Sequence, residues 1–453
     1  MGWLTGTQVA AGGVTRLDLT FARNADGQLI GVTDNASSGR GASFGYTDAG
    51  RLNAASGPWG ADAFTYDAAG NRTDKARTIG GVTVHETPVL ASTSNRVTQV
   101  KDGSGAVRRT LTYNPGGDLA EDAVTAGADY RFAYDGRKRL VSAGAVSGDT
   151  GTYGYDYRGR RVWRTVTGSS SIVQTHYIFD EAGHLIAEHD GTTGAVRREY
   201  VWLDDTPVAM IDSTGAAPVT YFIHTGQIEE PLVMTDASQV KVWDAYVEPY
   251  GAATVFGTPS AGLDLRLPGQ FSQAETGALS QNWNRDYDTS LGRYIEADPL
   301  GIDAGQNVYA YVDGDPLTEI DPHGLQVPVP MPAPPPPIYG GTPGDSSASS
   351  ALEQILDNAM MRVDVAIRNQ VARQSAYQKA KDFCDRPPRR SGNKCSDLSR
   401  LIDHAKRCID LTQQFDDNWN PGRHADKISQ WKTRLQNLKD QHRTQCTVKC
   451  PTS

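Results

Sequence analysis

The sequence predicts a mainly β protein, built from a sheet of repeated β-hairpins and followed by a small separate α-helical C-terminal domain. Glycine contributes 47 of the 453 residues and tyrosine 19, a mixture typical of short aromatic strands joined by tight turns. A Tyr-Asp-x-x-Gly pattern recurs through the first half of the chain. Beyond residue 350 the apolar residues take a helical period. A chain of this length is also expected to contain more than one domain.

Charge and cysteine content divide the chain at the same place. Residues 326–453 contain 19 Lys and Arg against 13 Asp and Glu, whereas residues 1–325 contain 25 against 40. All five cysteines lie in the basic part, so any disulfide or metal chemistry is expected there. No apolar run approaches the roughly 18 residues that a membrane helix needs, and no targeting segment is visible at the start. We therefore expect no membrane span.

The repeat is clearest at residues 46–52 and 66–72, which read Tyr-Thr-Asp-Ala-Gly-Arg-Leu and Tyr-Asp-Ala-Ala-Gly-Asn-Arg. Looser copies begin at Tyr113, Tyr134 and Tyr155, and weaker ones at Phe21 and Phe179. The interval of 47 residues between Tyr66 and Tyr113 is expected to contain one degenerate copy. Each copy predicts a hairpin turn, because the Asp can accept backbone N–H groups and the Gly can take positive φ. Since a single hairpin is marginal in water, such hairpins must stack into one continuous sheet.

On this pattern, residues 1–264 resemble the YD-repeat, or RHS (rearrangement hot spot), family. The resemblance implies that the strip of hairpins winds into part of a hollow shell. An ordinary β-sandwich or β-propeller is the alternative architecture.

Residues 265–325 are similar to the RHS-associated core domain. The resemblance rests on Leu-Pro-Gly-Gln at 267–270, Gly-Arg-Tyr-Ile-Glu-Ala-Asp-Pro-Leu-Gly at 292–301 and Asp-Pro-His-Gly-Leu at 321–325. One departure precedes this segment. Where the family usually carries His-Thr-Asp-x-x-Gly-Ser/Thr-Pro, residues 224–231 read His-Thr-Gly-Gln-Ile-Glu-Glu-Pro, so we expect a locally altered structure there.

Two Asp-Pro corners in this segment suggest chemistry. Asp298 and Asp321 lie 23 residues apart, and Arg285 lies a further 13 upstream. Two carboxylates that are brought close cannot both ionise easily, so one can act as a general acid while the other activates water. The family resemblance implies self-cleavage by an aspartyl-type site, with Asp298 and Asp321 as the acid and base, Arg285 as their electrostatic partner and the bond between Leu325 and Gln326 as the one broken.

The alternative is that both aspartates only initiate turns before proline. Four other acidic residues of this segment are expected to be turn or surface residues: Asp286, Asp288, Asp303 and Asp315.

Residues 326–350 form a Pro, Gly and Ser-rich linker, expected to be an extended tether. Residues 351–453 are expected to form the helical domain. Its first helix should run from about residue 352 to 381, its second should follow a cap at Ser396 and Asp397, and its third should begin at Asn420 and Pro421.

The limited core of such a domain suggests support from disulfides. Cys408 falls on an apolar stripe and is expected to be the unpaired fifth cysteine. The disulfide candidates are Cys384, Cys395, Cys446 and Cys450. Zinc is the lesser option, because the cysteine spacings do not form the usual short pairs. We assign no metal and no cofactor.

Two pairs of residues in the tail are candidate effector sites. Asp403 and His404 could form a general base oriented by a carboxylate. Arg423 and His424 fall in the first turn of the expected third helix, where a phosphate could bind. For both pairs, ordinary solvated side chains are the alternative. The basic charge of this part and the candidate phosphate site at Arg423 and His424 together favour a nucleic-acid target and a nuclease activity.

The resemblance implies that residues 326–453 are an antibacterial effector, which the shell encloses and the cleavage releases. It also implies a preceding shell or delivery module, a cognate immunity protein, and export into a target cell by a dedicated secretion system. Two alternatives remain: a surface scaffold with a non-enzymatic binding module, and an inactive orphan fragment.

Overall fold

The computed structural model describes residues 3–11, 13–36, 39–277, 279–325, 329–330, 384, 394–419 and 425–446. The chain divides into two compact units, Met1–Asp345 and Ser346–Ser453. The expected helix at 352–381 lies outside the described residues, as does nearly all of the linker. Of the helices that are described, none has the length and apolar character needed to cross a membrane.

The first unit is dominated by β-strands, with three short 3-10 helices. The strands are β1 (Gly6–Ala11), β2 (Val14–Arg23), β3 (Leu29–Asp34), β4 (Ala42–Tyr46), β5 (Leu52–Gly57), β6 (Gly60–Tyr66), β7 (Arg72–Ile79), β8 (Val82–Leu90), β9 (Val97–Lys101), β10 (Val107–Tyr113), β11 (Leu119–Val124), β12 (Tyr130–Tyr134), β13 (Leu140–Ala145), β14 (Thr150–Tyr155), β15 (Arg161–Thr167), β16 (Ile172–Phe179), β17 (Leu185–Asp190), β18 (Val196–Leu203), β19 (Thr206–Asp212), β20 (Val219–Thr225), β21 (Pro231–Thr235), β22 (Lys241–Val247), β23 (Ala253–Val255), β24 (Phe271–Ser272), β25 (Leu279–Asn282), β26 (Arg285–Asp288), β27 (Arg293–Tyr294), β28 (Glu319–Ile320) and β29 (Val329–Pro330). The 3-10 helices are η1 (Ala274–Thr276), η2 (Gly301–Ala304) and η3 (Val312–Gly314).

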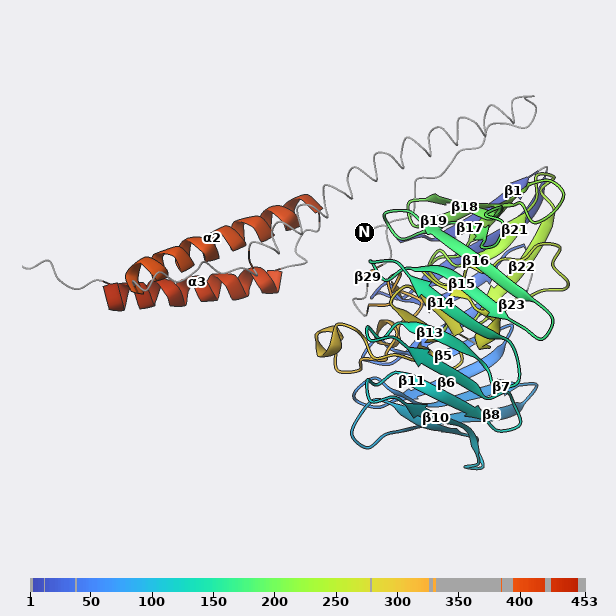
Figure 1. Ribbon diagram of the computed structural model, residues 1–453, viewed down its shortest axis with the longest axis horizontal. Coiled ribbons are helices and arrows are strands. Elements are labelled where there is room, and N and C mark those ends of the chain that lie inside the picture. The colour runs from blue at the N-terminus through green and yellow to red at the C-terminus, as the bar shows by residue number, and fades with distance from the viewer. Residues whose placement is uncertain are drawn as a thin grey trace, which may run out of the picture. The chain divides into compact units, whose positions relative to one another are not determined.

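Strands β1 to β23 form one antiparallel meander, in which each strand pairs with the next along the chain. Figure 1 shows β13 to β16 lying side by side in chain order. These pairings confirm the predicted stacking of hairpins. A single hairpin is marginally stable in water, and here each hairpin is stabilised by pairing with the neighbouring hairpins in the sheet.

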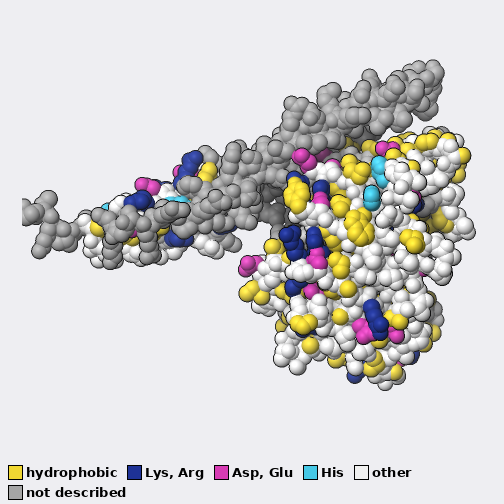
Figure 2. Space-filling view, viewed as in Figure 1, with side chains coloured by type: hydrophobic (Ala, Val, Ile, Leu, Met, Phe, Trp, Pro, Cys, Tyr) yellow, Lys and Arg dark blue, Asp and Glu magenta, His cyan; other side chains and the backbone are white. Residues whose placement is uncertain are grey.

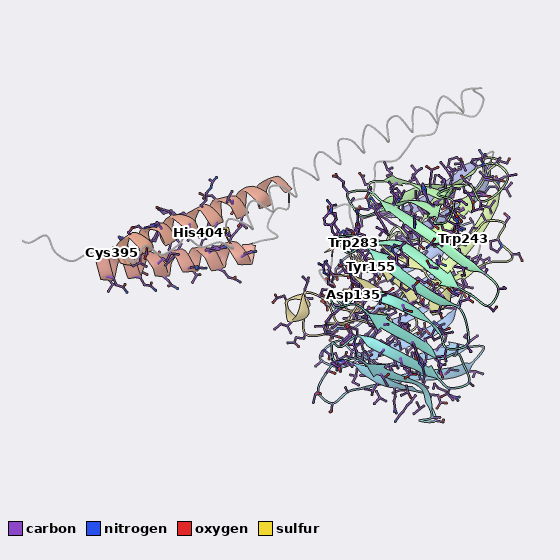
Figure 3. All side chains as sticks on the ribbon, in the orientation of Figure 1. Asp135, Tyr155, Trp243, Trp283, Cys395 and His404 are labelled. Atoms are coloured by element: carbon purple, nitrogen blue, oxygen red, sulfur yellow. A yellow bond between two sulfur atoms is a disulfide. The ribbon has the colours of Figure 1, made fainter. Side chains whose placement is uncertain are left out.

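The repeated turn works as its residues predict. In the copy that follows β14, the Asp156 carboxylate accepts the backbone N–H groups of Arg158 and Arg160 at 2.9 Å each. Gly159 completes this turn with φ +83°, a conformation that a residue with a Cβ adopts at a cost. Asp135 accepts the equivalent bonds from Arg137 and Arg139 in the preceding copy (Figure 3).

In several copies the aromatic residue joins its copy to the one before. The hydroxyl of Tyr66 donates to the backbone oxygen of Leu52 at 2.6 Å, and the hydroxyl of Tyr155 donates to that of Leu140 at 2.6 Å. The leucines are almost fully buried. In these copies the ring therefore packs inward while its hydroxyl satisfies a backbone acceptor of the preceding hairpin, which favours Tyr at this position.

The degenerate copy expected between Tyr66 and Tyr113 lies at the turn between β8 and β9. The N–H of Ala91 donates to the oxygen of Arg96 at 2.8 Å, the same closing bond that Asp67 and Asn71 make in the preceding copy. Leu90 takes the place of the aromatic residue. Because the turn keeps its backbone bonds without Asp or Gly, the sequence pattern is lost while the hairpin persists.

The sheet folds back so that its first strands pack against its last ones. One buried cluster unites Leu17 and Leu52 with Leu232, Val233 and Tyr250, which lie in or beside the last strands. The interior formed in this way holds most of residues 265–325, which we call the core segment, whereas Leu300, Ile302 and Asp303 at η2 are exposed. On the face seen in Figure 2, acidic and basic side chains alternate with hydrophobic ones, so no large surface of a single charge is visible there.

The unusual turn at residues 226–230 keeps its shape through a compensating change. Gly226 occupies the position of the usual Asp, and the carboxylate of Glu230 lies over it and accepts the N–H of Ile228 at 3.0 Å. The bond from the N–H of Gly226 to the oxygen of Glu230 closes the turn at 2.8 Å. Glu229 stands where the family has Gly and adopts φ +68°. The expected local alteration therefore consists of two changes. The carboxylate that binds the turn comes from Glu230 and not from position 226, and Glu229 is strained.

In the second unit, α2 (Lys394–Trp419) packs against α3 (Ala425–Cys446). The predicted stripe of α2 is buried at Leu398, Ala405, Cys408 and Thr412, and Ile428 of α3 is buried as well. The expected start of the third helix at Asn420 lies outside the described residues.

Two disulfides join this unit. Cys395 pairs with Cys446, connecting the beginning of α2 to the end of α3. Cys384 pairs with Cys408, so the prediction that Cys408 is the unpaired cysteine is wrong. A buried position on an apolar helix face is compatible with both a free cysteine and a disulfide-bonded one. The sequence pattern therefore could not show which of the two Cys408 is. Cys450 lies outside the described residues.

We expect Glu229→Gly to raise the free energy of unfolding by about 1 kcal/mol, since it removes the left-handed strain of a residue with a Cβ. Burial raises the pKa of Glu229 from 4.5 to about 7. The folded state therefore binds this proton more tightly, and the contribution of Glu229 to stability falls as pH rises through that range. The gain from Glu229→Gly should accordingly grow between pH 4.5 and about 7, measured by denaturant unfolding.

Gln239→Gly provides the comparison, because Gln239 is exposed and has φ +64° in another turn of the same sheet. It should show a backbone gain of similar size with no matching pH dependence. A loss of stability in both variants would contradict the strain at these two positions.

Candidate active site

The core segment is held inside the sheet by buried ion pairs from widely separated strands. All four residues of β25 and all four of β26 are buried. Arg109 of β10 pairs with Asp288 at 2.8 Å, Arg161 of β15 pairs with Asp286 at 3.2 Å, and Arg164 pairs with Glu275. These guanidinium groups compensate carboxylates that water cannot reach.

The prediction that Asp286 is a turn or surface residue is therefore wrong. Asp288 does initiate a turn, because its Oδ1 accepts the N–H groups of Ser290 and Leu291, but it is buried and not a surface residue. Each is 3% exposed or less and anchors the segment to the sheet. Asp315 is half-buried, and its carboxylate accepts a bond from Gln28 at 3.3 Å. Asp303 lies in η2 and is exposed, as expected.

The structure brings Arg285, Asp298 and Asp321 together in one buried site. Nη2 of Arg285 lies 2.9 Å from Oδ2 of Asp298 and 3.3 Å from Oδ2 of Asp321. The three side chains are 0%, 0% and 3% exposed. One nitrogen atom thus bridges the two carboxylates that the sequence places 23 residues apart.

The turn chemistry of the two Asp-Pro corners presents the carboxylates to Arg285. Oδ1 of Asp298 accepts the N–H of Leu300 at 2.7 Å, and the N–H of Asp298 donates to the oxygen of Val308 at 2.9 Å. The corners therefore have the turn geometry expected for Asp before Pro, and the same carboxylates also converge on one guanidinium. Turn formation and site formation are compatible here.

Arg285 and Asp321 also hold the chain immediately before the expected cleavage site. Nε of Arg285 donates to the oxygen of Gly324 at 2.6 Å, and the N–H of Leu325 donates to Oδ1 of Asp321 at 3.0 Å. The peptide group between Gly324 and Leu325 is thus bound at both its oxygen and its nitrogen. Gln326 lies outside the described residues.

Gly324 allows this close approach. It adopts φ +61°, and a Cβ there would collide with the backbone oxygen of Asn282 and lie 3.2 Å from the nitrogen of Arg285. The C-terminal end of the core segment can therefore lie against β25 and β26 only with glycine at this position.

The charge balance of the site favours acid and base chemistry. If both carboxylates are ionised, the group of three side chains carries a net negative charge inside the protein, which is costly without water. One bound proton would neutralise the site and leave one carboxylic acid beside one carboxylate, the combination used to hydrolyse peptide bonds.

Sequence reasoning missed Tyr294 and Asn282. The hydroxyl of Tyr294 donates to Oδ2 of Asp321 at 2.8 Å, and Nδ2 of Asn282 donates to both the Tyr294 hydroxyl and the backbone oxygen of Asp321, at 2.8 Å each. A tyrosine in a short strand usually signals packing alone. Its place in the motif at 292–301, four residues before Asp298, is a sequence signal that could have identified it.

Of the tail candidates, Asp403 and His404 are described, and they do not form a comparable site. Asp403 is exposed and pairs with Lys406 at 3.2 Å, while His404 is buried against Trp431 and lies 3.9 Å from the sulfur of Cys408. The structure therefore does not bring Asp403 and His404 together as a carboxylate-oriented base. Arg423 and His424 lie outside the described residues.

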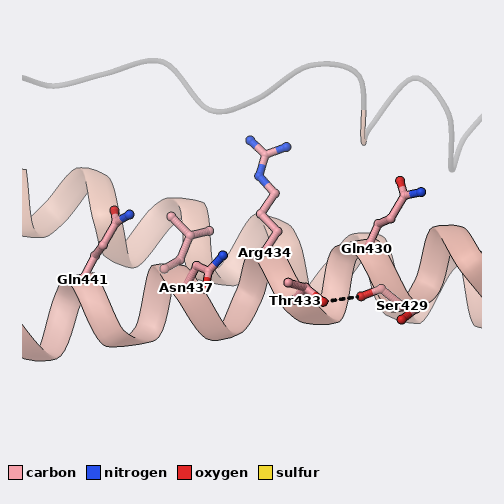
Figure 4. Close-up of a pocket in the computed structure, with 7 residues that line it drawn as sticks. Ser429, Gln430, Thr433, Arg434, Asn437 and Gln441 are labelled. Atoms are coloured by element: carbon pink, nitrogen blue, oxygen red, sulfur yellow. Dashed lines mark hydrogen bonds between the residues drawn. The ribbon is translucent and has the colours of Figure 1, made fainter.

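An open groove runs along α3 (Figure 4). Its lining consists of Ser429, Gln430, Thr433, Arg434, Asn437, Leu438 and Gln441. Arg434 stacks on the ring of Trp431, 4.9 Å from its centroid. These lining side chains include no carboxylate, histidine or cysteine, so they supply no general base or thiol nucleophile. Within the described part of the chain, no cluster of three or more His, Cys, Asp or Glu side chains could hold a metal ion.

Comparison with known proteins places the sheet and most of the core segment in a recognised class. A family model described as the teneurin YD-shell matches residues 1–311. Double-stranded DNA deaminase toxin A of Burkholderia cenocepacia is 31% identical over 327 residues, which cover 66% of this chain and 22% of that protein. Toxin protein Tse5 of Pseudomonas aeruginosa is 28% identical over 355 residues, which cover 67% of this chain and 26% of that protein.

A solved structure shows the same fold. The Photorhabdus luminescens Tc holotoxin pore matches 74% of this chain and 18% of its own chain, with a TM-score of 0.57 and 16% identity. The chain thus spans roughly a quarter or less of the length of these proteins.

We expect Gly324→Ala to lower the free energy of unfolding by about 2 to 3 kcal/mol more than Gly301→Ala, because only the first adds a collision. Gly301 has the same φ of +61° and no neighbour within 4 Å of an added Cβ. Both variants should carry the common strain of about 1 kcal/mol. Denaturant unfolding of the two variants in an Asp298→Asn background measures the difference, and equal losses would exclude the predicted collision at Gly324.

Proposed function

This chain belongs to the YD-repeat (RHS) family of polymorphic toxins, and we propose that its sheet encloses residues 326–453 and releases them by one self-cleavage between Leu325 and Gln326. The domains would then be the shell at 1–264, the self-cleaving core at 265–325, the linker at 326–350 and the effector at 351–453. The proposal extends to a preceding shell or delivery module, which the similarity to longer toxins supports.

One observation carries the proposal. A single nitrogen of Arg285 binds the carboxylates of Asp298 and Asp321, and Asp321 also binds the N–H of Leu325. The pair of carboxylates is therefore one residue from the bond to be broken. Its burial strengthens every electrostatic interaction in the site.

The reaction would use one water molecule and the two carboxyl groups. The ionised carboxylate takes a proton from water as the water oxygen attacks the carbonyl carbon of Leu325, forming a tetrahedral intermediate. The carboxylic acid then gives its proton to the nitrogen of Gln326 as the carbon–nitrogen bond breaks. The products are a carboxylate at Leu325 and a free amino group at Gln326, and Arg285 offsets negative charge throughout.

The released part would be an antibacterial effector. Residues 326–453 lie beyond the matched family region, carry a net positive charge and include a disulfide-bonded helical pair. A nucleic-acid target is supported by this charge and by the name of the Burkholderia relative, a double-stranded DNA deaminase toxin. We further propose export into a target cell and a small immunity protein that protects the producing cell.

Self-cleavage can be tested on one gel. The purified wild-type chain should yield a fragment of about 325 residues, whereas Asp298→Asn and Asp321→Asn should stay at full length, with the rate lowered by at least ~100-fold because the acid or base is lost. Asp303→Asn is the matched control, since Asp303 is an exposed carboxylate five residues from Asp298. Intact wild-type chain, or cleavage in both site variants, would refute the aspartyl mechanism.

Effector activity needs a separate measurement. Residues 326–453 produced in a bacterium should slow growth in the periplasm, where disulfides form, and less in the reducing cytoplasm. Cys395→Ser combined with Cys446→Ser should reduce the periplasmic effect, since the link between α2 and α3 is removed. Unimpaired growth in both compartments would favour the non-enzymatic binding alternative.

A further inference from the structure

Tyr294 contacts two of the three charged residues of the proposed site, Asp321 and Arg285. Its side chain is fully buried in β27, and its hydroxyl donates to Oδ2 of Asp321 at 2.8 Å. The guanidinium carbon of Arg285 lies 3.5 Å from the centroid of its ring. One residue therefore contacts both the carboxylate and the cation.

We propose that Tyr294 is the positioning residue that keeps Asp321 ionised and so makes Asp321, rather than Asp298, the general base. The inference rests on the proposed self-cleavage and assigns the two carboxyl groups their separate roles.

The donors around Asp321 support this assignment. Oδ2 faces the Tyr294 hydroxyl and Nη2 of Arg285, and Oδ1 faces the N–H of Leu325. An ionised carboxylate is an acceptor only and satisfies all three donors, whereas a protonated one would turn its own O–H toward one of them. Three converging donors therefore favour the carboxylate form of Asp321, and the proposal accordingly assigns the proton of the general acid to Asp298.

Asn282 fixes the direction of the Tyr294 hydroxyl. Its Nδ2 donates to the phenol oxygen at 2.8 Å, which leaves the single phenol proton for Asp321. Burial, together with the nearby charge of Asp321, raises the pKa of Tyr294 well above its usual value. The phenol thus remains a donor and does not become a competing acid or base.

Other charged and titratable groups also face Asp321. They are Arg285 and Asp298, which share the ion pair, Tyr311, whose pKa is raised by burial and by Asp321, and His323, which interacts electrostatically with Asp321. Among these described groups, Arg285 also donates to Asp321 in a hydrogen bond at 3.3 Å, and the same nitrogen lies 2.9 Å from Asp298. The Tyr294 hydroxyl donates to Asp321, whereas Asp298 accepts the backbone N–H of Leu300.

In the proposed reaction Tyr294 exchanges no proton. Asp321 accepts the proton of the attacking water, Asp298 donates its own to the nitrogen of Gln326, and the phenol proton stays on Tyr294. After the C–N bond has broken, Asp321 carries the proton and Asp298 is ionised.

Tyr294→Phe in the full chain tests the assignment, because it removes the hydroxyl and keeps the ring beneath Arg285. The uncut chain is made by cell-free synthesis, and the appearance of the fragment is followed over time in buffers from acidic to alkaline pH. Cleavage should slow by about 10- to 100-fold near neutral pH, the effect of losing one hydrogen bond to a charged group. The acidic limb of the pH–rate profile should also move to higher pH, since Asp321 is protonated more easily without this donor.

Tyr287→Phe is the matched control. Tyr287 is equally buried, and its ring lies 5.6 Å from that of Tyr294, but its hydroxyl donates to the backbone oxygen of Tyr250. This variant loses a buried hydroxyl of the same kind without touching Asp321, so its rate and pH profile should match the wild type.

The outcomes separate the two proposals. A slower Tyr294→Phe with an unshifted pH profile, or a rate equal to wild type, overturns the role of Tyr294 while self-cleavage stands. An equal slowing in Tyr287→Phe also overturns it, because general loosening of the site would then suffice. A wild-type chain that stays intact overturns the self-cleavage itself.

Discussion

The buried guanidinium of Arg285 is the interaction on which the site depends. It contacts two carboxylates, the oxygens of Gly324 and Val308, and the face of the Tyr294 ring. Four segments of chain meet at this one side chain: β26, the stretch from β27 to the corner at Asp298, the loop at Val308 and the end of the core segment. A buried charge with this many partners is costly to assemble, and removing any partner leaves the others uncompensated. The contacts of Arg285 therefore contribute to the specificity of the fold, since few other packings of the core segment could satisfy all of the polar groups involved.

The sheet solves the burial problem for the rest of the core segment in the same way. Arginines of β10 and β15 reach inward to Asp288, Asp286 and Glu275, which are separated from them in sequence by more than 100 residues. The repeat itself supplies only backbone pairing and a layer of Leu and Tyr. Arginines at particular positions on the inner face of the sheet then bind carboxylates of the core segment and so determine which part of the chain is enclosed. A uniform scaffold thus acquires a unique interior through a few charged side chains.

Local chemistry explains which features the sequence could predict. The turn at Asp156 and Gly159 is formed by hydrogen bonds within five residues, so the local sequence is sufficient to predict it. The burial of Asp286 depends on Arg161, which the chain brings near only when the sheet folds back, so no local pattern could reveal it. The family resemblance predicted that Asp298 and Asp321 converge. The contacts of Tyr294 and Asn282 with Asp321 depend on the register of β25 to β27, which no local pattern reveals. The pairing of Cys408 likewise needed the tertiary structure.

The geometry also explains how a site with little open space could act once. A protease that turns over must bind and release its substrate, whereas here the bonds to Gly324 and Leu325 hold the reacting chain through covalent connection and a high effective concentration. Both contacts lie on the side of the proposed break that stays attached to the sheet, so they oppose departure of the shell product and do not restrain residues 326–453. The new carboxylate at Leu325 would add negative charge beside Asp298 and Asp321, which disfavours binding of a second chain. In the proposed self-cleavage, single turnover would therefore follow from the same contacts that position the bond for attack.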